Sequence, residues 1–166
     1  MNNWSTEDTP AGPFTAVVDA DGAVLAGGWT ARLDELVPLV SRELLREAPR
    51  EAADLGPLTR AIRDYHAGDL HAVDGIPVRQ RSGEFLEHAW EVLRKVPAGE
   101  PVSYTELAAL AGRPQAARAA ASACARNAAA LFVPCHRVLR SDGSLGGFRW
   151  GLPVKRWLLS HETTTN

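Results

Sequence analysis

A cysteine followed directly by a histidine, Cys135-His136, is the pair in this chain best suited to nucleophilic chemistry. A thiolate is a strong nucleophile, and a nearby imidazole can take the proton from a thiol. The pair follows an apolar run at residues 128–133 and a proline, Pro134. Apolar runs closed by proline are typical of a protein core. Cys135 is therefore either a buried structural residue or a thiol held rigidly at a pocket, and the dipeptide alone favours the structural alternative.

One other cysteine, Cys124, lies eleven residues before Cys135. The chain has no C-x-x-C motif, and a structural disulfide is rare in a reducing compartment. The histidines at positions 66, 71, 88 and 161 show no ligand spacing relative to the cysteines. We therefore expect free thiols and no metal site.

The elements that position this pair belong to a chain of 166 residues, long enough for one full-sized domain or two small ones. The chain is 45% hydrophobic and 23% charged, which is ordinary for a folded soluble protein. No stretch approaches the roughly 18 apolar residues of a membrane span. Residues 1–10 are polar, unlike a signal peptide. We expect a cytoplasmic protein that does not associate with a membrane.

Charge is distributed unevenly along the chain. Residues 1–76 hold 6 basic and 13 acidic side chains, a net charge of −7, whereas residues 77–166 hold 12 and 7, a net charge of +5. A basic half attracts polyanions such as nucleic acids, and an acidic half would face away from them. Chance scatter of surface charge can produce the same asymmetry, so it is a weak indication by itself.

The first half, residues 1–76, is predicted to form a small N-terminal α/β domain. Residues 14–18 and 23–29 are rich in β-forming side chains and flank the turn dipeptide Asp21-Gly22. This pattern is typical of a β-hairpin. No residue of this half is predicted to be catalytic.

Two helices are expected after the hairpin. Apolar residues recur at helical spacing over residues 34–47, and Pro38 limits where this helix begins. Proline opens a second helix over residues 57–66, and residues 70–78 are expected to be irregular.

The second half, residues 77–166, is predicted to be mostly helical. Apolar spacing indicates a helix over residues 85–96 with Ser82 as its N-cap. Ser103 and Glu106 form a capping box, which opens a short helix. The fold class expected from both halves is α+β, a small antiparallel sheet with helices followed by a mostly helical domain.

A helix-turn-helix is expected within this second domain. The helix that follows the capping box ends at Gly112, and another begins with Pro114 at its first position and runs to about residue 125. After the Cys-His pair, residues 140–151 hold four glycines and two aromatic residues. This segment either folds over a flat ligand or forms a surface turn. A last short helix covers residues 155–162.

The helix at residues 114–125 is unusually rich in alanine. Small side chains allow close packing against a second helix, which is the common reason for such a pattern. They also allow close approach to a nucleic-acid backbone, and one long cation, Arg118, rises from this surface. Both interpretations remain open on the pattern alone.

The segment Pro134-Cys135-His136-Arg137-Val138 resembles the active-site signature of the O6-alkylguanine-DNA alkyltransferases, also called methylated-DNA–protein-cysteine methyltransferases. The resemblance extends over residues 77–162 and is of the bacterial type. Its other matches are residues 102–104, 117–119, 127, 145–151 and 158–162.

The resemblance implies direct reversal of DNA damage. The alkyl group of O6-alkylguanine, and also of O4-alkylthymine, would pass irreversibly to the cysteine, once per molecule and without a cofactor. The partner implied is double-stranded DNA carrying the lesion, from which the damaged nucleotide is flipped. The protein would act as a monomer in the cytoplasm, at the nucleoid when bound to DNA.

The resemblance also implies roles for individual residues. Catalytic roles fall to Cys135, His136, Glu162, Asn127 and Tyr104. DNA contacts fall to Ser103, Pro114, Arg118, Ala119, Ala121, Ser122 and Arg126. The base pocket would contain Pro134, Val138, Cys124, Phe148, Arg149 and Trp150. Two residues depart from the family pattern, because Phe148 replaces a common tyrosine and Ala128 a common proline.

Three other functions remain as alternatives. A lesion-binding module would flip the base without transfer, but that subfamily replaces the nucleophile, which Cys135 retains. A cysteine hydrolase would need an oxyanion hole, and no hydrolase signature surrounds the cysteine. A helix-turn-helix regulator would have no use for the Cys-His pair.

Overall fold

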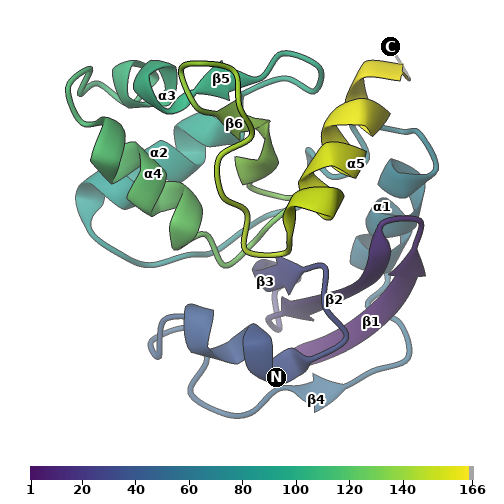
Figure 1. The fold of residues 1–166 in the computed structure, drawn as a ribbon. Helices are drawn as coiled ribbons and strands as arrows, with labels where there is room; N and C mark the ends of the chain where they lie inside the picture. The colour runs from purple at the N-terminus through teal and green to yellow at the C-terminus, as the bar shows by residue number, and fades with distance from the viewer. Residues whose placement is uncertain (165–166) are drawn as a thin grey trace. The chain divides into compact units, whose positions relative to one another are not determined.

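The computed structural model describes residues 1–164, and the chain forms two compact units (Figure 1). Unit 1 comprises Met1–Arg81 and Ala128–Phe132. Unit 2 comprises Ser82–Asn127 and Val133–Asn166, of which residues 165 and 166 lie outside the described part. The polypeptide therefore leaves unit 2 after Asn127, contributes five residues to unit 1, and returns two residues before Cys135.

Unit 1 contains a four-stranded sheet with the order β3-β2-β1-β4. The strands are β1 (Asn3–Thr9), β2 (Gly12–Val18), β3 (Val24–Gly28) and β4 (Arg50–Glu51). The predicted hairpin is confirmed as the antiparallel pair β2–β3. Strand β1 was not predicted, because its polar alternation gives little apolar signal. It pairs antiparallel with β2 along its whole length, and the short β4 pairs parallel with its start.

The predicted helix over residues 34–47 is wrong. Two short 3₁₀ helices, η1 (Leu33–Glu35) and η2 (Val37–Leu39), occupy its first part, and residues 40–49 form turns and irregular chain. Pro38 has no N–H group to donate and crowds the preceding turn, which opposes a continuous α-helix. The helix expected at residues 57–66 is confirmed as α1 (Pro57–His66), which begins at its proline and contacts β1.

The segment Ala128–Phe132 is held in unit 1 by β3 and by aromatic packing. The N–H of Gly27 donates to the carbonyl of Ala128 over 2.8 Å, and the N–H of Ala130 donates back to Gly27 over 3.1 Å. The ring centroids of Phe132 and Phe14 lie 6.2 Å apart. Leu131 adopts a φ of 78°, a region that few residues other than glycine occupy. Burial and paired backbone groups therefore hold this turn against its intrinsic strain.

Unit 2 is mostly helical, as predicted. It contains α2 (Glu84–Leu93), α3 (Tyr104–Leu110), α4 (Ala117–Ala125), the 3₁₀ turn η3 (Cys135–Arg137) and α5 (Leu152–Thr164). A two-stranded parallel pair, β5 (Val102–Ser103) and β6 (Val138–Leu139), links the segment before α3 to the segment after η3. In Figure 1 these two strands lie side by side next to α3.

The predicted capping box is present at the start of α3. The N–H of Glu106 donates to Oγ of Ser103, and the Glu106 carboxylate accepts from the N–H of Ser103, both over 3.0 Å. The Ser82 cap is wrong, because Gly83 is the N-cap of α2 and no side chain caps it. The start of the next helix at Pro114 is also wrong, because α4 begins at Ala117 after a turn.

Helices α3 and α4 pack against each other as a helix-turn-helix, and α2 contacts both. Within residues 1–164, no helix is long and apolar enough to cross a membrane.

Candidate active site

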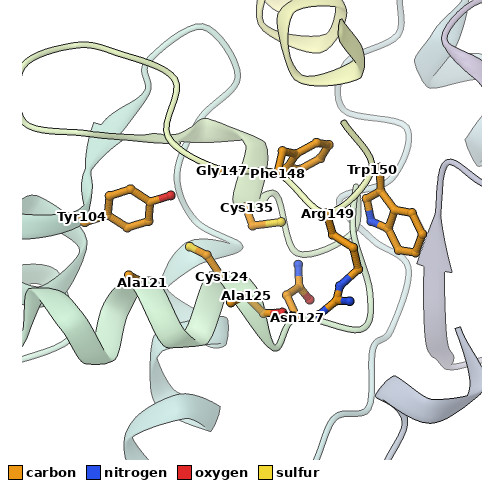
Figure 2. A pocket seen from close by; sticks show the side chains of 10 residues that line it. All are labelled: Tyr104, Ala121, Cys124, Ala125, Asn127, Cys135, Gly147, Phe148, Arg149 and Trp150. Atoms are coloured by element: carbon orange, nitrogen blue, oxygen red, sulfur yellow. Dashed lines mark hydrogen bonds between the residues drawn. The ribbon is translucent and has the colours of Figure 1, made fainter. Parts of the chain in front are cut away.

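A pocket of about 430 Å³ opens within unit 2, and Cys135 lies at its wall. One side of the pocket comes from α4 and the second residue after its end, with Ala121, Cys124, Ala125 and Asn127. The other sides come from Tyr104 of α3 and from the loop residues Gly147, Phe148, Arg149 and Trp150. Figure 2 shows the side chains of Tyr104, Cys124 and Cys135 among the residues that line the pocket.

The backbone on either side of Cys135 is fixed by a tight turn. Pro134 has φ −80° and ψ 67°, the geometry of an inverse γ-turn, and the Cys135 N–H donates to the Val133 carbonyl over 2.8 Å. Nδ2 of the buried Asn127 donates to the same carbonyl, also over 2.8 Å. Proline restricts φ and Asn127 clamps the carbonyl, so the thiol is presented from a rigid support.

Burial raises the pKa of the Cys135 thiol above its ordinary value. A hydrogen bond from the Asn127 side chain and the positive charges of Lys155 and Arg149 oppose this effect but do not reverse it. Cys135 is thus a neutral thiol at rest, and its activation requires a base. The pKa of Cys124 is also raised, mainly by burial, which makes that thiol a poor nucleophile.

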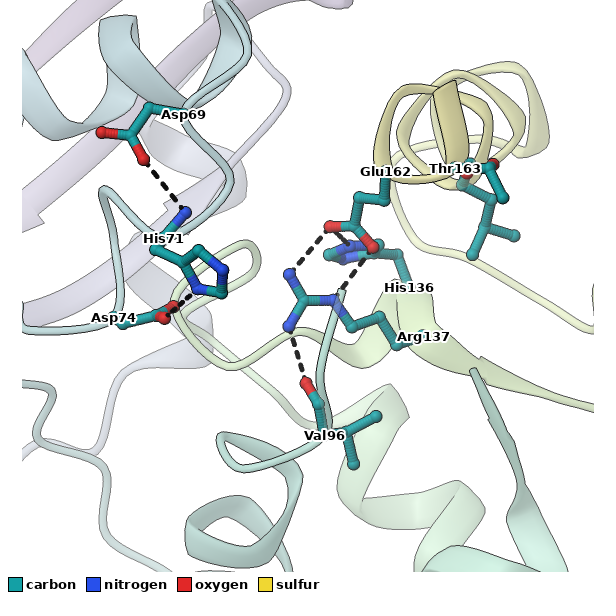
Figure 3. Close-up of polar contacts among 9 residues, drawn as sticks. Asp69, His71, Asp74, Val96, His136, Arg137, Glu162 and Thr163 are labelled. Carbon is teal, nitrogen blue, oxygen red and sulfur yellow. Dashed lines mark hydrogen bonds and ion pairs between the residues drawn. The ribbon is translucent and has the colours of Figure 1, made fainter. Parts of the chain in front are cut away.

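His136, which follows this thiol in the chain, meets Glu162 of α5 in the interior of unit 2. Nε2 of His136 lies 2.8 Å from Oε2 of Glu162, and neither residue is exposed to solvent. The Arg137 guanidinium donates to both carboxylate oxygens, over 2.9 and 2.8 Å, and to the Val96 carbonyl over 2.7 Å. Figure 3 shows the Glu162 carboxylate in contact with both the His136 imidazole and the Arg137 guanidinium.

This arrangement favours a neutral His136 beside an ionised Glu162. Burial lowers the pKa of His136, although the nearby Glu162 carboxylate opposes the shift. The pKa of Glu162 lies well below its usual range despite burial, because His136 and Arg137 stabilise the carboxylate. Since Nε2 donates to Glu162, the bare lone pair is on Nδ1. Among the described residues, His136 Nδ1 is the buried side-chain nitrogen that no protein group pairs.

Helix α4 has three faces: one is buried against α2, one lines the pocket and one is exposed. Ala120 and Ala123 are buried, and the Ala123 carbonyl accepts a 2.8 Å hydrogen bond from Nε1 of Trp90 in α2. A second face lines the pocket through Ala121 and Cys124. Arg118 is exposed, and it forms no ion pair within the part of the chain that the structure describes. Helix packing and close external approach are therefore both compatible with the alanine pattern.

The loop between β6 and α5 closes the pocket opposite α4. Nη2 of Arg149 donates to the carbonyl of Ala125 at the end of α4, over 2.9 Å. Gly146 has a φ of 72°, and a Cβ at this position would lie 3.1 Å from the Tyr104 hydroxyl. Burial raises the pKa of Tyr104, with Cys124 and Cys135 adding to the effect, so its hydroxyl stays protonated and able to donate.

The remaining residues singled out from the sequence lie around this site. Pro134 and Val138 are buried on either side of the Cys135 turn and are not part of the pocket wall. Ser103 caps α3, Pro114 is exposed in the turn before α4, and three positions lie on α4 or at its C-cap: Ala119, Ser122 and Arg126. Within residues 1–164, no group of three or more His, Cys, Asp or Glu side chains could hold a metal ion.

Two buried cations were missed in the sequence. Arg137 and Lys155 are 5% and 0% exposed, whereas isolated basic residues are ordinarily assigned to the surface. On α5, Lys155 shares a buried face with Leu158 and Glu162.

Comparison with known proteins connects this geometry to one family. Residues 84–164 match the family model "6-O-methylguanine DNA methyltransferase, DNA binding domain". The chain is 34% identical over 156 residues to a methylated-DNA–protein-cysteine methyltransferase of Shigella flexneri, covering 93% of this chain and 91% of the relative.

Solved structures give the same result. The O6-methylguanine methyltransferase of Mycobacterium tuberculosis superposes with a TM-score of 0.80 at 27% identity, covering 100% of this chain and 95% of the other. A structure of that bacterium's protein in complex with DNA also has a TM-score of 0.80 at 27% identity and covers 98% and 94% of the two chains. The α+β fold predicted from the sequence is confirmed by these likenesses.

Proposed function

The chain belongs to the methylated-DNA–protein-cysteine methyltransferases, and we propose that it repairs O6-alkylguanine in duplex DNA by transferring the alkyl group to Cys135. The observation that carries this assignment is Cys135 itself, placed at the wall of a pocket and followed in the chain by His136, which contacts Glu162. O4-alkylthymine is the second substrate that we propose, because it presents the same alkylated oxygen next to a ring nitrogen.

His136 acts as the general base in this proposal. Its Nε2–H is committed to Glu162, so Nδ1 takes the Cys135 proton through a water molecule. Arg137 contributes because it neutralises the Glu162 carboxylate and thereby keeps the imidazole uncharged before the reaction. Burial raises the pKa of Cys135, so the resting thiol is protonated. The reactive thiolate therefore forms only when His136 removes the proton.

The chemical step is an in-line displacement at the alkyl carbon. A bond forms between that carbon and the Cys135 sulfur, while the bond from the carbon to O6 breaks and its electron pair remains on guanine. The leaving guanine anion takes a proton from Tyr104, whose hydroxyl faces the pocket. The product is a neutral thioether that water does not cleave, so each protein molecule reacts once.

Access to O6 requires the nucleotide to leave the stacked duplex, at a cost of about a few kcal/mol. We assign this step to the exposed face of α4, where Arg118 fills the space vacated by the base. Ser103, Pro114, Ala119, Ser122 and Arg126 lie on or beside the two helices and would contact the DNA backbone. Phe148, Arg149 and Trp150 would cover the flipped base, with Cys124 as an apolar wall.

We also propose that the protein works as a monomer in the cytoplasm, bound to the chromosome when it acts. One molecule supplies every residue assigned above, since the pocket and the His136–Glu162 pair both lie within unit 2.

Intact mass spectrometry tests the function directly. The protein is mixed with one equivalent of a duplex oligonucleotide that contains O6-methylguanine, and the reacted chain is then digested. We expect a single methyl group on the peptide that carries Cys135, at a stoichiometry of one. Tight binding with no gain in mass would instead assign the chain as a lesion-binding module, and catalytic turnover would refute the proposal.

A further inference from the structure

Lys155 is a buried cation whose hydrogen-bond partners are all neutral. Its side chain is fully buried in unit 2. Nζ donates to the backbone carbonyls of Val138 over 2.8 Å, Leu145 over 2.5 Å and Gly147 over 3.4 Å. Within residues 1–164, no carboxylate forms an ion pair with it. Buried ammonium groups are ordinarily paired with an anion, so this one calls for a reason.

The three carbonyls belong to the two segments that frame the reacting group. Val138 follows the turn that carries Cys135, and it begins β6. Leu145 and Gly147 belong to the loop that covers the pocket, and Gly147 lines it. One ammonium therefore ties the support of the thiol to the cover of the pocket. Its Nζ also lies 5.9 Å from the centroid of the Phe148 ring, within range of a cation–π contact.

The charge of Lys155 acts on the thiol as well as on the loop. Burial lowers the pKa of Lys155, whereas its electrostatic interactions with Cys135 and Cys124 raise it. The reverse effect is present at Cys135, where the positive charge of Lys155 opposes the effect of burial on the thiol pKa. The other charged or titratable groups around the two residues are Arg140, Arg149, Tyr104 and His136. None of these supplies a carboxylate.

The anion with which the charge of Lys155 interacts is therefore a thiolate, and the Cys135 thiolate forms during the reaction. We propose that Lys155 is a positioning residue for alkyl transfer, which holds the loop over the pocket and balances the negative charge that develops on the Cys135 sulfur. The inference rests on the proposed function, since it assumes that Cys135 is the nucleophile. This role explains why the hydrogen-bond partners of Lys155 are neutral carbonyls. A carboxylate beside Lys155 would cancel its charge before the thiolate forms.

Three substitutions separate the two roles. Lys155→Arg keeps the charge, Lys155→Gln keeps hydrogen-bond donors without the charge, and Lys155→Met removes both. Lys95→Met is the matched control, because Lys95 is the other lysine of the chain and is exposed. Thermal denaturation first establishes that each variant is folded. If Lys155→Met does not fold, Lys155→Gln supplies the charge test.

The measurement is the rate at which iodoacetamide alkylates Cys135 as a function of pH, followed on the peptide that contains it. We expect alkylation at pH 7.5 to be about tenfold slower in Lys155→Gln and Lys155→Met, with the pH profile displaced to higher pH. Lys155→Arg restores most of the rate, and Lys95→Met matches the wild type. Transfer from O6-methylguanine DNA, measured in a single turnover, falls at least as much in the Gln and Met variants.

Unchanged iodoacetamide profiles in folded Lys155→Gln and Lys155→Met would overturn the charge role. This assay contains no DNA, so its failure is distinct from failure of the proposed function. If the alkylation profile depends on Lys155 but the wild-type protein takes no methyl group from DNA, the proposed function is refuted and the charge role of Lys155 stands.

Discussion

Nε2 of His136 lies 2.8 Å from Oε2 of Glu162, and this buried contact fixes which imidazole nitrogen is free to act as a base. Because Glu162 also accepts two hydrogen bonds from Arg137, a change at this carboxylate affects both the base and the packing of the helical unit.

Glu162→Gln should slow alkyl transfer about a hundredfold, because general-base contributions are commonly of that order. It should also destabilise the fold by about 3–5 kcal/mol, because it leaves the Arg137 guanidinium buried without its anion. Single-turnover kinetics and urea denaturation measure the two effects. The exposed Glu91→Gln on α2 is the control, and a wild-type transfer rate in folded Glu162→Gln would remove this residue from the mechanism.

Stability should fall as the pH drops below about 6.5. Burial lowers the pKa of His136 from its usual 6.5, so the unfolded chain binds the proton more tightly than the folded one. The contribution of His136 to the free energy of unfolding is therefore complete above the pKa of the imidazole in the unfolded chain. It is lost as the pH falls through the lower pKa of the imidazole in the folded protein. The lowered pKa of Glu162 adds a second loss, which begins near its unfolded value of 4.5.

Denaturant titrations between pH 5 and 8 measure this dependence. His136→Gln removes the group that titrates and should flatten the slope between pH 5 and 6.5. The exposed His71→Gln is the matched control and should keep the wild-type slope. Equal slopes in wild type and His136→Gln would contradict the assignment of a neutral, buried imidazole.

Arg118→Ala should impair repair of duplex DNA far more than reaction with free O6-benzylguanine. Arg118 is exposed on α4 and lines no part of the pocket, so a free base does not need it. Rates with both substrates are compared at several salt concentrations. Arg60→Ala removes an exposed arginine from α1 in the other unit and should leave both rates near wild type. Equal losses with the two substrates in Arg118→Ala would exclude an intercalating role.

Gly146→Ala should slow transfer by displacing Tyr104. The added methyl group would lie 3.1 Å from the Tyr104 hydroxyl, at a φ of 72° that costs about 1 kcal/mol for a residue with a side chain. Gly143→Ala carries the same backbone strain at a φ of 86° but meets nothing within 4 Å. The single-turnover rate of Gly146→Ala should therefore fall below that of Gly143→Ala, while their melting temperatures fall together. Equal transfer rates in Gly146→Ala and Gly143→Ala would show that the position of the Tyr104 hydroxyl does not depend on the glycine at 146.

Asn127→Ala should both loosen the turn and weaken activation of the thiol. The lost hydrogen bond to the Val133 carbonyl costs about 0.5–1.5 kcal/mol, because the Cys135 N–H still donates to that carbonyl. Its effect on Cys135 should displace the pH profile of thiol alkylation to higher pH, since Asn127 now lowers the thiol pKa. Asn127→Asp, which keeps the side-chain shape, serves as the second variant. A destabilised protein with an unchanged thiol profile would limit Asn127 to a structural role.

Local sequence rules identified the elements that are encoded by neighbouring residues. The capping box at Ser103 and the proline at the start of α1 were both found because each satisfies backbone groups within one turn. The same rules failed over residues 34–47, where apolar spacing was present but Pro38 opposes a continuous helix. Strand β1 was missed because its pairing partner, not its own composition, stabilises it.

The nucleophile and Glu162 could be found from the family resemblance, but the burial of Arg137 and Lys155 could not. Cys135 and His136 are adjacent in the sequence, whereas Glu162 lies 26 residues from His136 and reaches it only through the fold. Lys155 gave no sequence signal for its role, because its partners are backbone carbonyls that every residue possesses. Side chains that bind backbone atoms leave no complementary residue type to search for.

The five residues Ala128–Phe132 belong to unit 1 although unit 2 precedes and follows them in the chain. No single cleavage of the polypeptide can therefore yield two intact units. A fragment that begins at Ser82 would carry this apolar segment without Gly27 and Phe14, the groups that pair and pack with it. Such a fragment should expose hydrophobic surface three residues before the nucleophile and aggregate more readily than the whole chain. The two units are thus distinct in the fold, but neither corresponds to one continuous stretch of the sequence.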